Sequence, residues 1–100
     1  METSAKIKNE QTALIEEKLR QHFPNVEAYR YNPASIRVRI IDDRFRGKSN
    51  PERDDMVWPL LEQLPQEIQE DVTILLLLTE EEKEYRMMNV EFEHPTPSML

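Results

Sequence analysis

One hundred residues with a formal net charge of −7 limit this chain to one domain with a modest core. Its 20 acidic residues against 13 basic ones favour solubility and disfavour nonspecific binding to nucleic acid. The absence of cysteine excludes disulfides, thiolate metal sites and cysteine nucleophiles. No segment resembles a signal peptide, and the longest apolar run, Ile74 to Leu78, is too short to span a bilayer. We therefore expect a cytoplasmic protein with no membrane partner.

The N-terminal half predicts one helix and a β-hairpin. Residues 10–23 carry apolar side chains at helical spacing, with Asn9 as the expected N-cap and Pro24 as the stop. Residues 26–41 predict two antiparallel strands around the turn-forming segment Asn32 to Ser35. The second strand alternates between apolar and basic side chains, which is typical of a strand with one buried face.

The C-terminal half predicts helices around a third strand. A helix begins at the capping box formed by Ser49 and Glu52, and Pro65 opens a second, shorter helix. Residues 73–78 form a nearly continuous apolar run, which predicts a buried strand. Thr79 then caps a short helix that ends near residue 85.

The order of these elements predicts the fold class. Val90 and Phe92 alternate with glutamates, which indicates a candidate extra strand near the C-terminus. The full order is α-β-β-α-α-β-α, followed by this strand. We predict an α+β domain of two layers, with helices packed on one face of a three-stranded mixed sheet. Residues 1–93 would form this single domain, and residues 94–100 would be a disordered tail.

The tripeptide Gly47–Ser49, Gly-Lys-Ser, resembles the end of a phosphate-binding loop. Such a loop needs another glycine five residues before the Gly-Lys pair, and Asp42 occupies that position. The residues between them are bulky and would block a phosphate cradle. We therefore interpret Gly47 as a turn residue with positive φ, Phe45 as a side chain that packs inward, and Ser49 as a helix cap.

Basic residues gather between the second predicted strand and the helix that follows it. Residues 37–48 hold five basic side chains against two acidic ones, although the whole chain is acidic. One interpretation is a surface for RNA, DNA or an acidic partner, on which Tyr29 and Tyr31 would stack bases. The alternative is a solvated sheet face whose arginines are neutralised by glutamates at cross-strand positions.

The sequence offers no recognisable catalytic, metal or cofactor set. His22 and His94 have no second ligand at a metal-binding spacing, and no carboxylate stands out as a general acid or base. Ser35, Ser49 and Thr79 are better explained as turn or cap residues than as nucleophiles. We therefore expect a protein that is not an enzyme and that binds no cofactor.

From Ile36 to Leu61 the sequence resembles the BolA-like family. The matching pattern places a phenylalanine, a glycine and a serine between a strand and a helix, and an arginine in that helix. In this chain Phe45, Gly47, Ser49 and Arg53 match it, together with Lys48 between the glycine and the serine. The later segment "EDVTILLLLTEEE" resembles the final strand and helix start of the family. The resemblance covers residues 10–85 and implies the α-β-β-α-α-β-α fold of the family, which is related to the type II KH domain.

Two positions that usually hold histidine in the family hold other residues in this chain. Asp54 stands beside Arg53 where the first histidine is usual, and the later histidine aligns with Asp71 or its neighbours. Members of the family use that later histidine to share an iron–sulfur cluster with monothiol glutaredoxins. The resemblance therefore implies a binding protein without iron–sulfur ligation.

These observations predict a non-catalytic BolA-like adaptor whose protein partner the sequence does not identify. Pairing of the C-terminal strand with another sheet edge would make it a homodimer. The alternative prediction is a nucleic-acid-binding module. For either function, the predicted contact surface consists of Tyr29, Tyr31, Arg37, Arg39, Arg44, Arg46, Lys48 and Arg53.

Overall fold

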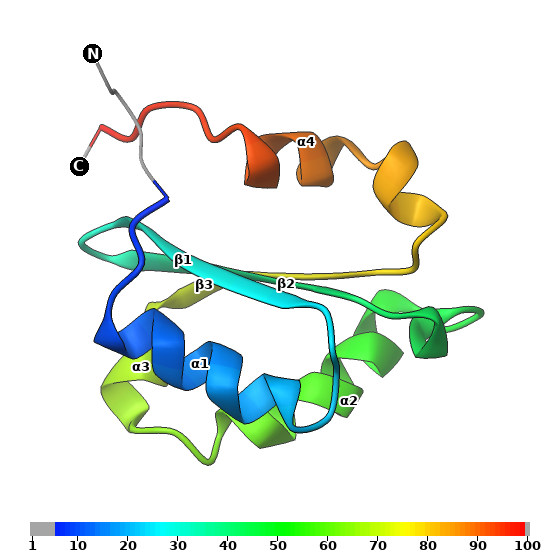
Figure 1. Ribbon diagram of the computed structural model, residues 1–100, viewed down its shortest axis with the longest axis horizontal. Coiled ribbons are helices and arrows are strands. Elements are labelled where there is room, and N and C mark those ends of the chain that lie inside the picture. Colours follow the sequence, from blue (N-terminus) through cyan, green and yellow to red (C-terminus); the bar gives the residue numbers. More distant parts are fainter. Residues whose placement is uncertain (1–5, 100) are drawn as a thin grey trace.

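The computed structural model describes residues 6–99 (Figure 1). Its α+β class and the order of its elements are as predicted. None of the helices within these residues has the length and apolar character needed to cross a bilayer. The elements are α1 (Glu10–Arg20), β1 (Val26–Asn32), β2 (Ser35–Ile41), η1 (Asp43–Phe45), α2 (Asn50–Leu61), α3 (Gln66–Asp71), β3 (Val72–Leu78), η2 (Glu82–Glu84) and α4 (Met87–Glu93).

The sheet has three strands in the order β1-β2-β3. β1 and β2 form the predicted antiparallel hairpin, in which Ala28 lies opposite Val38. β3 returns through α2 and α3 and pairs parallel to β2, so that Leu75 also lies beside Val38. β2 is therefore the central strand, and β1 and β3 are the two edge strands of the sheet.

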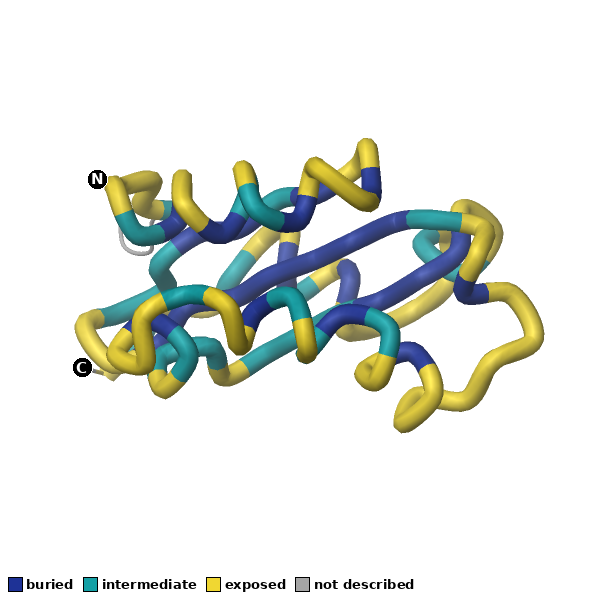
Figure 2. Tube along the Cα trace, turned by 90° about the horizontal axis from the view of Figure 1, so that it is seen from below, coloured by how far each residue is buried: buried dark blue, intermediate teal, exposed yellow. Residues whose placement is uncertain are grey.

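Helices α1, α2 and α3 cover one face of the sheet (Figures 1 and 2). Phe45 is fully buried, as predicted, and its ring stacks on Phe23 with the ring centroids 5.6 Å apart. The alternating apolar residues of the strands meet the apolar stripes of the helices in one core. Its buried side chains include Ile15, Leu19, Val38, Ile40, Val57 and Leu61.

The predicted start of α2 is confirmed in detail. The Ser49 backbone N–H donates to the Glu52 carboxylate (2.7 Å), and the Glu52 N–H donates to the Ser49 hydroxyl (3.3 Å). Gly47 has a φ of +77°, a left-handed conformation that a side chain would strain. The strand-to-helix connection therefore depends on one glycine for its turn and on a capping box for the helix that follows.

The C-terminal segment is the helix α4, and the predicted extra strand is wrong. The buried residues of this segment have helical spacing. Asn89 and Phe92 lie three residues apart and are buried, whereas Val90 is exposed. The alternation of Val90 and Phe92 was therefore a chance pattern within a short amphipathic helix. α4 lies across the second face of the sheet, opposite α1, α2 and α3 (Figure 1). Helices therefore cover both faces of the sheet, whereas the sequence predicted them on one face, because α4 pairs its glutamates with the arginines of β2. The domain boundary at residue 93 and the disordered tail stay predictions.

Candidate functional site

The structure divides the eight predicted contact residues into three groups. Tyr29, Arg37 and Arg39 are buried on the sheet face that α4 covers, and Tyr31 is half-buried beside them. Arg53 is buried on α2, close to the end of β3. The remaining three are exposed in the loop between β2 and α2, namely Arg44, Arg46 and Lys48.

Arg37 is held by the C-terminal segment and by the tyrosines of β1. Its Nη1 donates to Glu91 (3.0 Å) and lies 3.4 Å from the Tyr29 hydroxyl, and its guanidinium stacks 3.6 Å from the centroid of the Tyr31 ring. The Tyr29 hydroxyl in turn donates to the Phe92 carbonyl oxygen (2.7 Å). The hydrogen bond from Arg37 holds the pKa of the Glu91 carboxyl below its ordinary value. The Arg37 guanidinium and the Tyr29 hydroxyl, which would otherwise face a ligand, thus bind α4 instead.

Arg39 makes the second contact between β2 and α4. Its Nη1 donates to Asn89 (2.6 Å) and to Glu93 (2.8 Å), and its Nη2 reaches Glu27 at 3.3 Å. The guanidinium lies 4.7 Å from the centroid of the Phe92 ring. The Arg39 hydrogen bond lowers the pKa of Glu93. The strand arginines are therefore neutralised by the cross-strand glutamate and by glutamates of α4.

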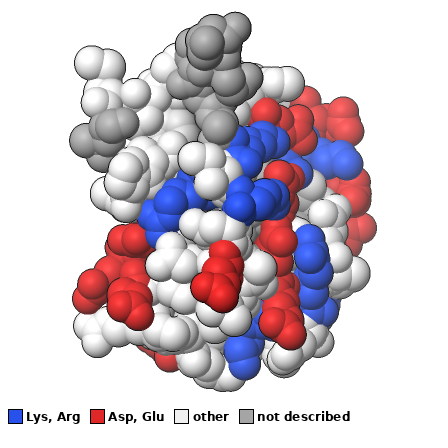
Figure 3. All heavy atoms as spheres, turned by 60° about the vertical axis from the view of Figure 1, so that its left-hand side comes forward, with Lys and Arg blue, Asp and Glu red and all other residues white. Residues whose placement is uncertain are grey.

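The loop arginines pair with nearby acidic residues. Arg44 donates to both carboxylate oxygens of Asp42 at 2.9 Å, and Arg46 reaches Glu81 at 3.2 Å and Asp43 at 3.3 Å. On the side of the molecule drawn in Figure 3, Lys and Arg side chains are interleaved with Asp and Glu. The structure does not bring the loop arginines and the strand arginines together on one open basic surface.

Arg53 is part of a buried ion pair that the sequence analysis did not identify. It donates to both oxygens of Glu82 (2.6 and 2.9 Å) and to the Leu77 carbonyl oxygen (2.9 Å). Glu82 also accepts the Thr79 backbone N–H (3.0 Å). The Arg53 hydrogen bonds lower the pKa of Glu82 to about 2. The capping-box spacing from Thr79 to Glu82 was the sequence signal that could have located this carboxylate beside the end of β3.

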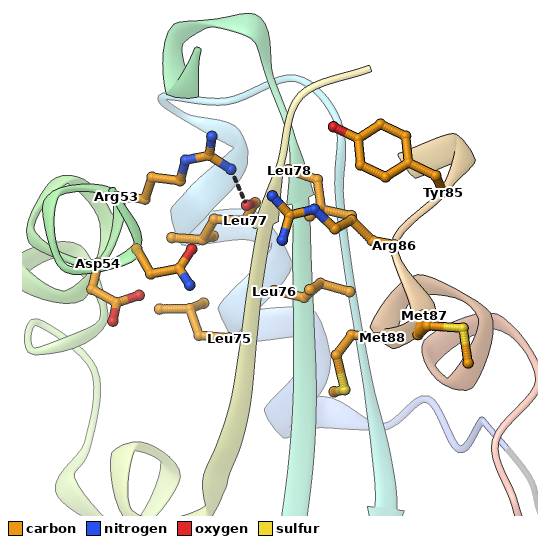
Figure 4. A pocket seen from close by; sticks show the side chains of 11 residues that line it. Arg53, Asp54, Leu75, Leu76, Leu77, Leu78, Tyr85, Arg86, Met87 and Met88 are labelled. Atoms are coloured by element: carbon orange, nitrogen blue, oxygen red, sulfur yellow. Dashed lines mark hydrogen bonds between the residues drawn. The ribbon is translucent and has the colours of Figure 1, made fainter. Parts of the chain in front are cut away.

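A hollow of about 590 Å³ lies along the free edge of β3. Figure 4 shows Arg53 and Asp54 of α2 on one side of the strand, and Tyr85, Met87 and Met88 on the other. Tyr85 is 64% exposed and Met87 is 82% exposed, although both are large apolar side chains. The walls come from segments far apart in the sequence, so no local motif predicts this hollow.

A second hollow of about 460 Å³ continues along the same edge, and the two hollows share Asp54 and Leu75. Asp55 and Trp58 of α2 line it as well. Within residues 6–99, the carboxylates of Asp54 and Asp55 form no salt bridge and no hydrogen bond. We call the two hollows together the β3 groove, lined by Asn50, Arg53, Asp54, Asp55, Trp58, residues 72–73 and 75–78, and residues 85–88.

The described residues hold no group of three histidine, aspartate or glutamate side chains that could bind a metal ion. His22 follows α1 and His94 follows α4, so they lie on opposite faces of the sheet. Glu82, the one carboxylate within residues 6–99 with a strongly shifted pKa, is held by Arg53 and is ionised at neutral pH. Such a group stabilises structure and is a poor proton carrier.

Comparison with known proteins identifies the fold. No protein-family model matches the sequence, and no curated protein matches it either. The BolA domain of SufE1 from Arabidopsis thaliana aligns with a TM-score of 0.57 and 21% identity, over 75% of this chain and 98% of that domain. BolA1 from Arabidopsis thaliana aligns with a TM-score of 0.52 and 22% identity, over 76% of this chain and 98% of that one.

The solution structure of BolA1 from Mus musculus aligns over 100% of this chain and 84% of that one, with a TM-score of 0.57 and 21% identity. The chain therefore has a BolA-like α+β fold, and the resemblance noted in the sequence is confirmed at the level of the fold. The α4 helix and the β3 groove are features of this chain on that framework.

Proposed function

We propose that this protein is a non-catalytic adaptor that binds another protein through the β3 groove and does not ligate an iron–sulfur cluster. The observation that carries the proposal is the groove itself, in which exposed apolar side chains stand beside an unpaired strand edge. Both features are typical of protein-binding surfaces. The BolA-like fold supports the adaptor class, because the resemblance implies binding rather than catalysis.

The proposal that no cluster is bound rests on the ligands available in the chain. Iron–sulfur clusters are held mainly by cysteine thiolates and sometimes by histidine, and the chain has no cysteine and two histidines. Asp54 and Asp71 stand at or near the positions where histidine is usual in BolA-like proteins. Carboxylates are hard oxygen ligands and are poor substitutes for a soft metal cluster.

The nucleic-acid alternative draws no support from the strand arginines while α4 is docked. Binding bases on Tyr29, Arg37 and Arg39 would require α4 to leave the sheet and expose its ion pairs. The exposed loop that holds Lys48 would remain available to phosphates. This alternative predicts binding to single-stranded RNA or DNA that weakens steeply with salt, and fluorescence anisotropy at low and at moderate salt measures it.

Site-specific photocrosslinking in the organism's own cells tests the proposed function. Tyr85→p-benzoylphenylalanine places the reactive group in the β3 groove, and Glu17→p-benzoylphenylalanine on the exposed side of α1 is the matched control. We expect a discrete protein adduct from position 85 that survives nuclease treatment and is absent from position 17. Adducts that require nucleic acid, or equal adducts from both positions, would count against the proposal.

Imaging of a fluorescent fusion would test the proposed cytoplasmic location.

A further inference from the structure

We propose that the β3 groove binds an extended peptide segment that adds to the sheet as a fourth strand beside β3 and that alternates apolar and basic residues. This inference rests on the proposed function and specifies the chemistry of the partner at the same site.

The edge of β1 is closed by the chain itself. Arg20 donates to the Val26 carbonyl oxygen (2.8 Å). The Ala28 N–H donates to Glu16 (2.9 Å), and the Ala28 carbonyl oxygen accepts from Lys8 (2.8 Å). Further along, Arg30 exchanges two backbone hydrogen bonds with Ile7 (2.8 and 3.3 Å). Each β1 residue whose backbone groups face away from β2, namely residues 26, 28 and 30, thus has a hydrogen-bond partner. This prevents another strand from pairing there.

The edge of β3 is open. The Leu78 carbonyl oxygen accepts the Asp42 N–H on the β2 side, so the backbone groups of Leu78 and, by alternation, Leu76 face β2. The backbone groups of Leu77 and Leu75 face outward, away from β2. Arg53 occupies the outward Leu77 carbonyl oxygen. Within residues 6–99, the Leu77 N–H and both backbone groups of Leu75 point away from β2 and have no hydrogen-bond partner, so a peptide backbone can pair with them.

The walls determine which side chains such a strand would carry. A residue opposite Leu75 would point its side chain to the same face as Leu75, towards α2, where Asp54 and Asp55 are exposed and unpaired. Its neighbours, opposite Ile74 and Leu76, would point to the other face, where the exposed apolar side chains of residues 85, 87 and 88 stand beside Arg86, which is paired with Glu82 at 3.5 Å. A lysine or arginine therefore fits opposite Leu75, and apolar residues fit on either side of it.

The charge of the chain argues for this occupant over a second copy or a nucleic acid. Two copies paired through β3 would bring together their acidic α2 walls and two chains of net charge −7 each. A nucleic acid would place phosphates against the same carboxylates. An extended peptide with basic side chains complements the wall and also satisfies the free backbone groups.

A synthetic probe tests the inference directly. The probe is an acetylated and amidated nine-residue peptide that alternates valine and lysine, and it is titrated into the full chain labelled with ¹⁵N. The matched peptide carries glutamate in place of lysine. The protein variant D54K/D55K reverses the charge of the wall, and E17K/E62K changes the net charge equally at exposed positions outside the groove.

We expect the lysine peptide to bind at least tenfold more tightly than the glutamate peptide. The variant D54K/D55K should reverse this order, and E17K/E62K should keep it. Hydrogen exchange of the Leu75 and Leu77 amides should slow at least tenfold on binding, while the Leu76 amide, which already faces β2, should change little. That pattern of alternate amides is specific to strand addition.

The inference is overturned if the lysine peptide does not bind, if both peptides bind equally to the native chain, or if binding leaves the Leu75 amide unprotected. A single-stranded oligonucleotide that protects Leu75 better than the lysine peptide would also overturn it. Failure of the peptide together with a protein adduct at position 85 would refute strand addition and leave the proposed function standing. Failure of both would refute both.

Discussion

The two faces of the sheet are closed by different kinds of contact. On one face, α1, α2 and α3 bury apolar side chains such as Ile15 and Ile40 against each other. On the other face, α4 docks through the ion pairs of Arg37 and Arg39, and the buried ring of Phe92 packs against that of Tyr29 with the centroids 4.8 Å apart. Apolar burial is non-directional and strong, whereas ion pairs lose much of their Coulombic gain to desolvation. The first face should therefore be much the more stable of the two.

This contrast shows that an alternating apolar and basic strand need not have an open face. The β2 arginines face inward because α4 supplies the glutamates that neutralise them. With both faces covered and the β1 edge closed, the β3 groove is the part of the sheet in residues 6–99 that remains accessible.

The largest effect is expected on the core face. Phe45→Ala removes a fully buried ring that stacks on Phe23 and should lower the free energy of unfolding by about 3–5 kcal/mol. Phe92→Ala on the α4 face should cost less, because the loss cannot exceed the free energy with which α4 docks on an otherwise intact domain. Urea titration monitored by Trp58 fluorescence measures both. An equal or larger loss for Phe92→Ala would mean that the two faces are one cooperative core.

The Arg53–Glu82 pair is expected to give the next largest effect. Arg53→Met leaves the Glu82 side chain, which is 14% exposed, with only Arg86 at 3.5 Å as a cationic partner, and should cost about 3 kcal/mol. The exposed Arg46–Glu81 pair is the matched control, and Arg46→Met should cost far less, because water and salt screen an exposed pair. NMR titration should also show the pKa of Glu82 rising from about 2 towards its ordinary value in Arg53→Met. Equal losses of unfolding free energy in the two variants would show that burial does not increase the contribution of the Arg53–Glu82 pair to stability.

Acid should weaken the α4 face through its glutamates. Glu91 and Glu93 of α4 and, separately, Glu82 beside Arg53 of α2 have folded pKa values below their ordinary ones, so their contribution is fully present above about pH 5. It is lost as the pH falls through the lower folded values, with Glu82 protonating last near pH 2. The double variant R37Q/R39Q should therefore lose less stability than the native chain between pH 5 and pH 3. Identical pH profiles would show that the α4 pairs do not contribute.

The smallest effect is expected in the loop. Lys48→Ala changes an exposed side chain outside both faces and should alter the free energy of unfolding by no more than about 0.5 kcal/mol. Gly47→Ala is the informative neighbour, because its φ of +77° should make that change cost about 1 kcal/mol despite the open space around it. Thermal unfolding of the two variants compares them. A larger loss for Lys48→Ala would reveal a structural role for its ammonium group.

Much of the core face could be predicted from the sequence because its signals are local. The capping box at Ser49, the turn at Gly47 and the alternation along β2 each depend on residues within a few positions of one another. Parallel pairing of β3 followed from the two helices that precede it. These features determine the order of elements and the BolA-like fold.

The α4 face and the groove could not be predicted in the same way because they depend on contacts between distant segments. Arg37 meets Glu91 and Arg39 meets Glu93 across more than 50 positions of sequence, so the strand arginines looked like an open surface. The seven residues of α4 are too few for a clear helical period, and the spacing of Val90 and Phe92 fits the alternation of a strand as well. The β3 groove exists only once α2 and α4 stand on either side of the edge.

Amide hydrogen exchange in the free protein tests whether the β3 edge is open while the rest of the sheet is closed. Ala28 on the β1 edge donates to Glu16, and Leu76 faces β2. Both amides should be protected at least 100-fold relative to the Leu75 amide, which should exchange almost as fast as in an unstructured peptide. A Leu75 amide as slow as that of Leu76 would contradict the account, because it would show that the β3 edge is already occupied.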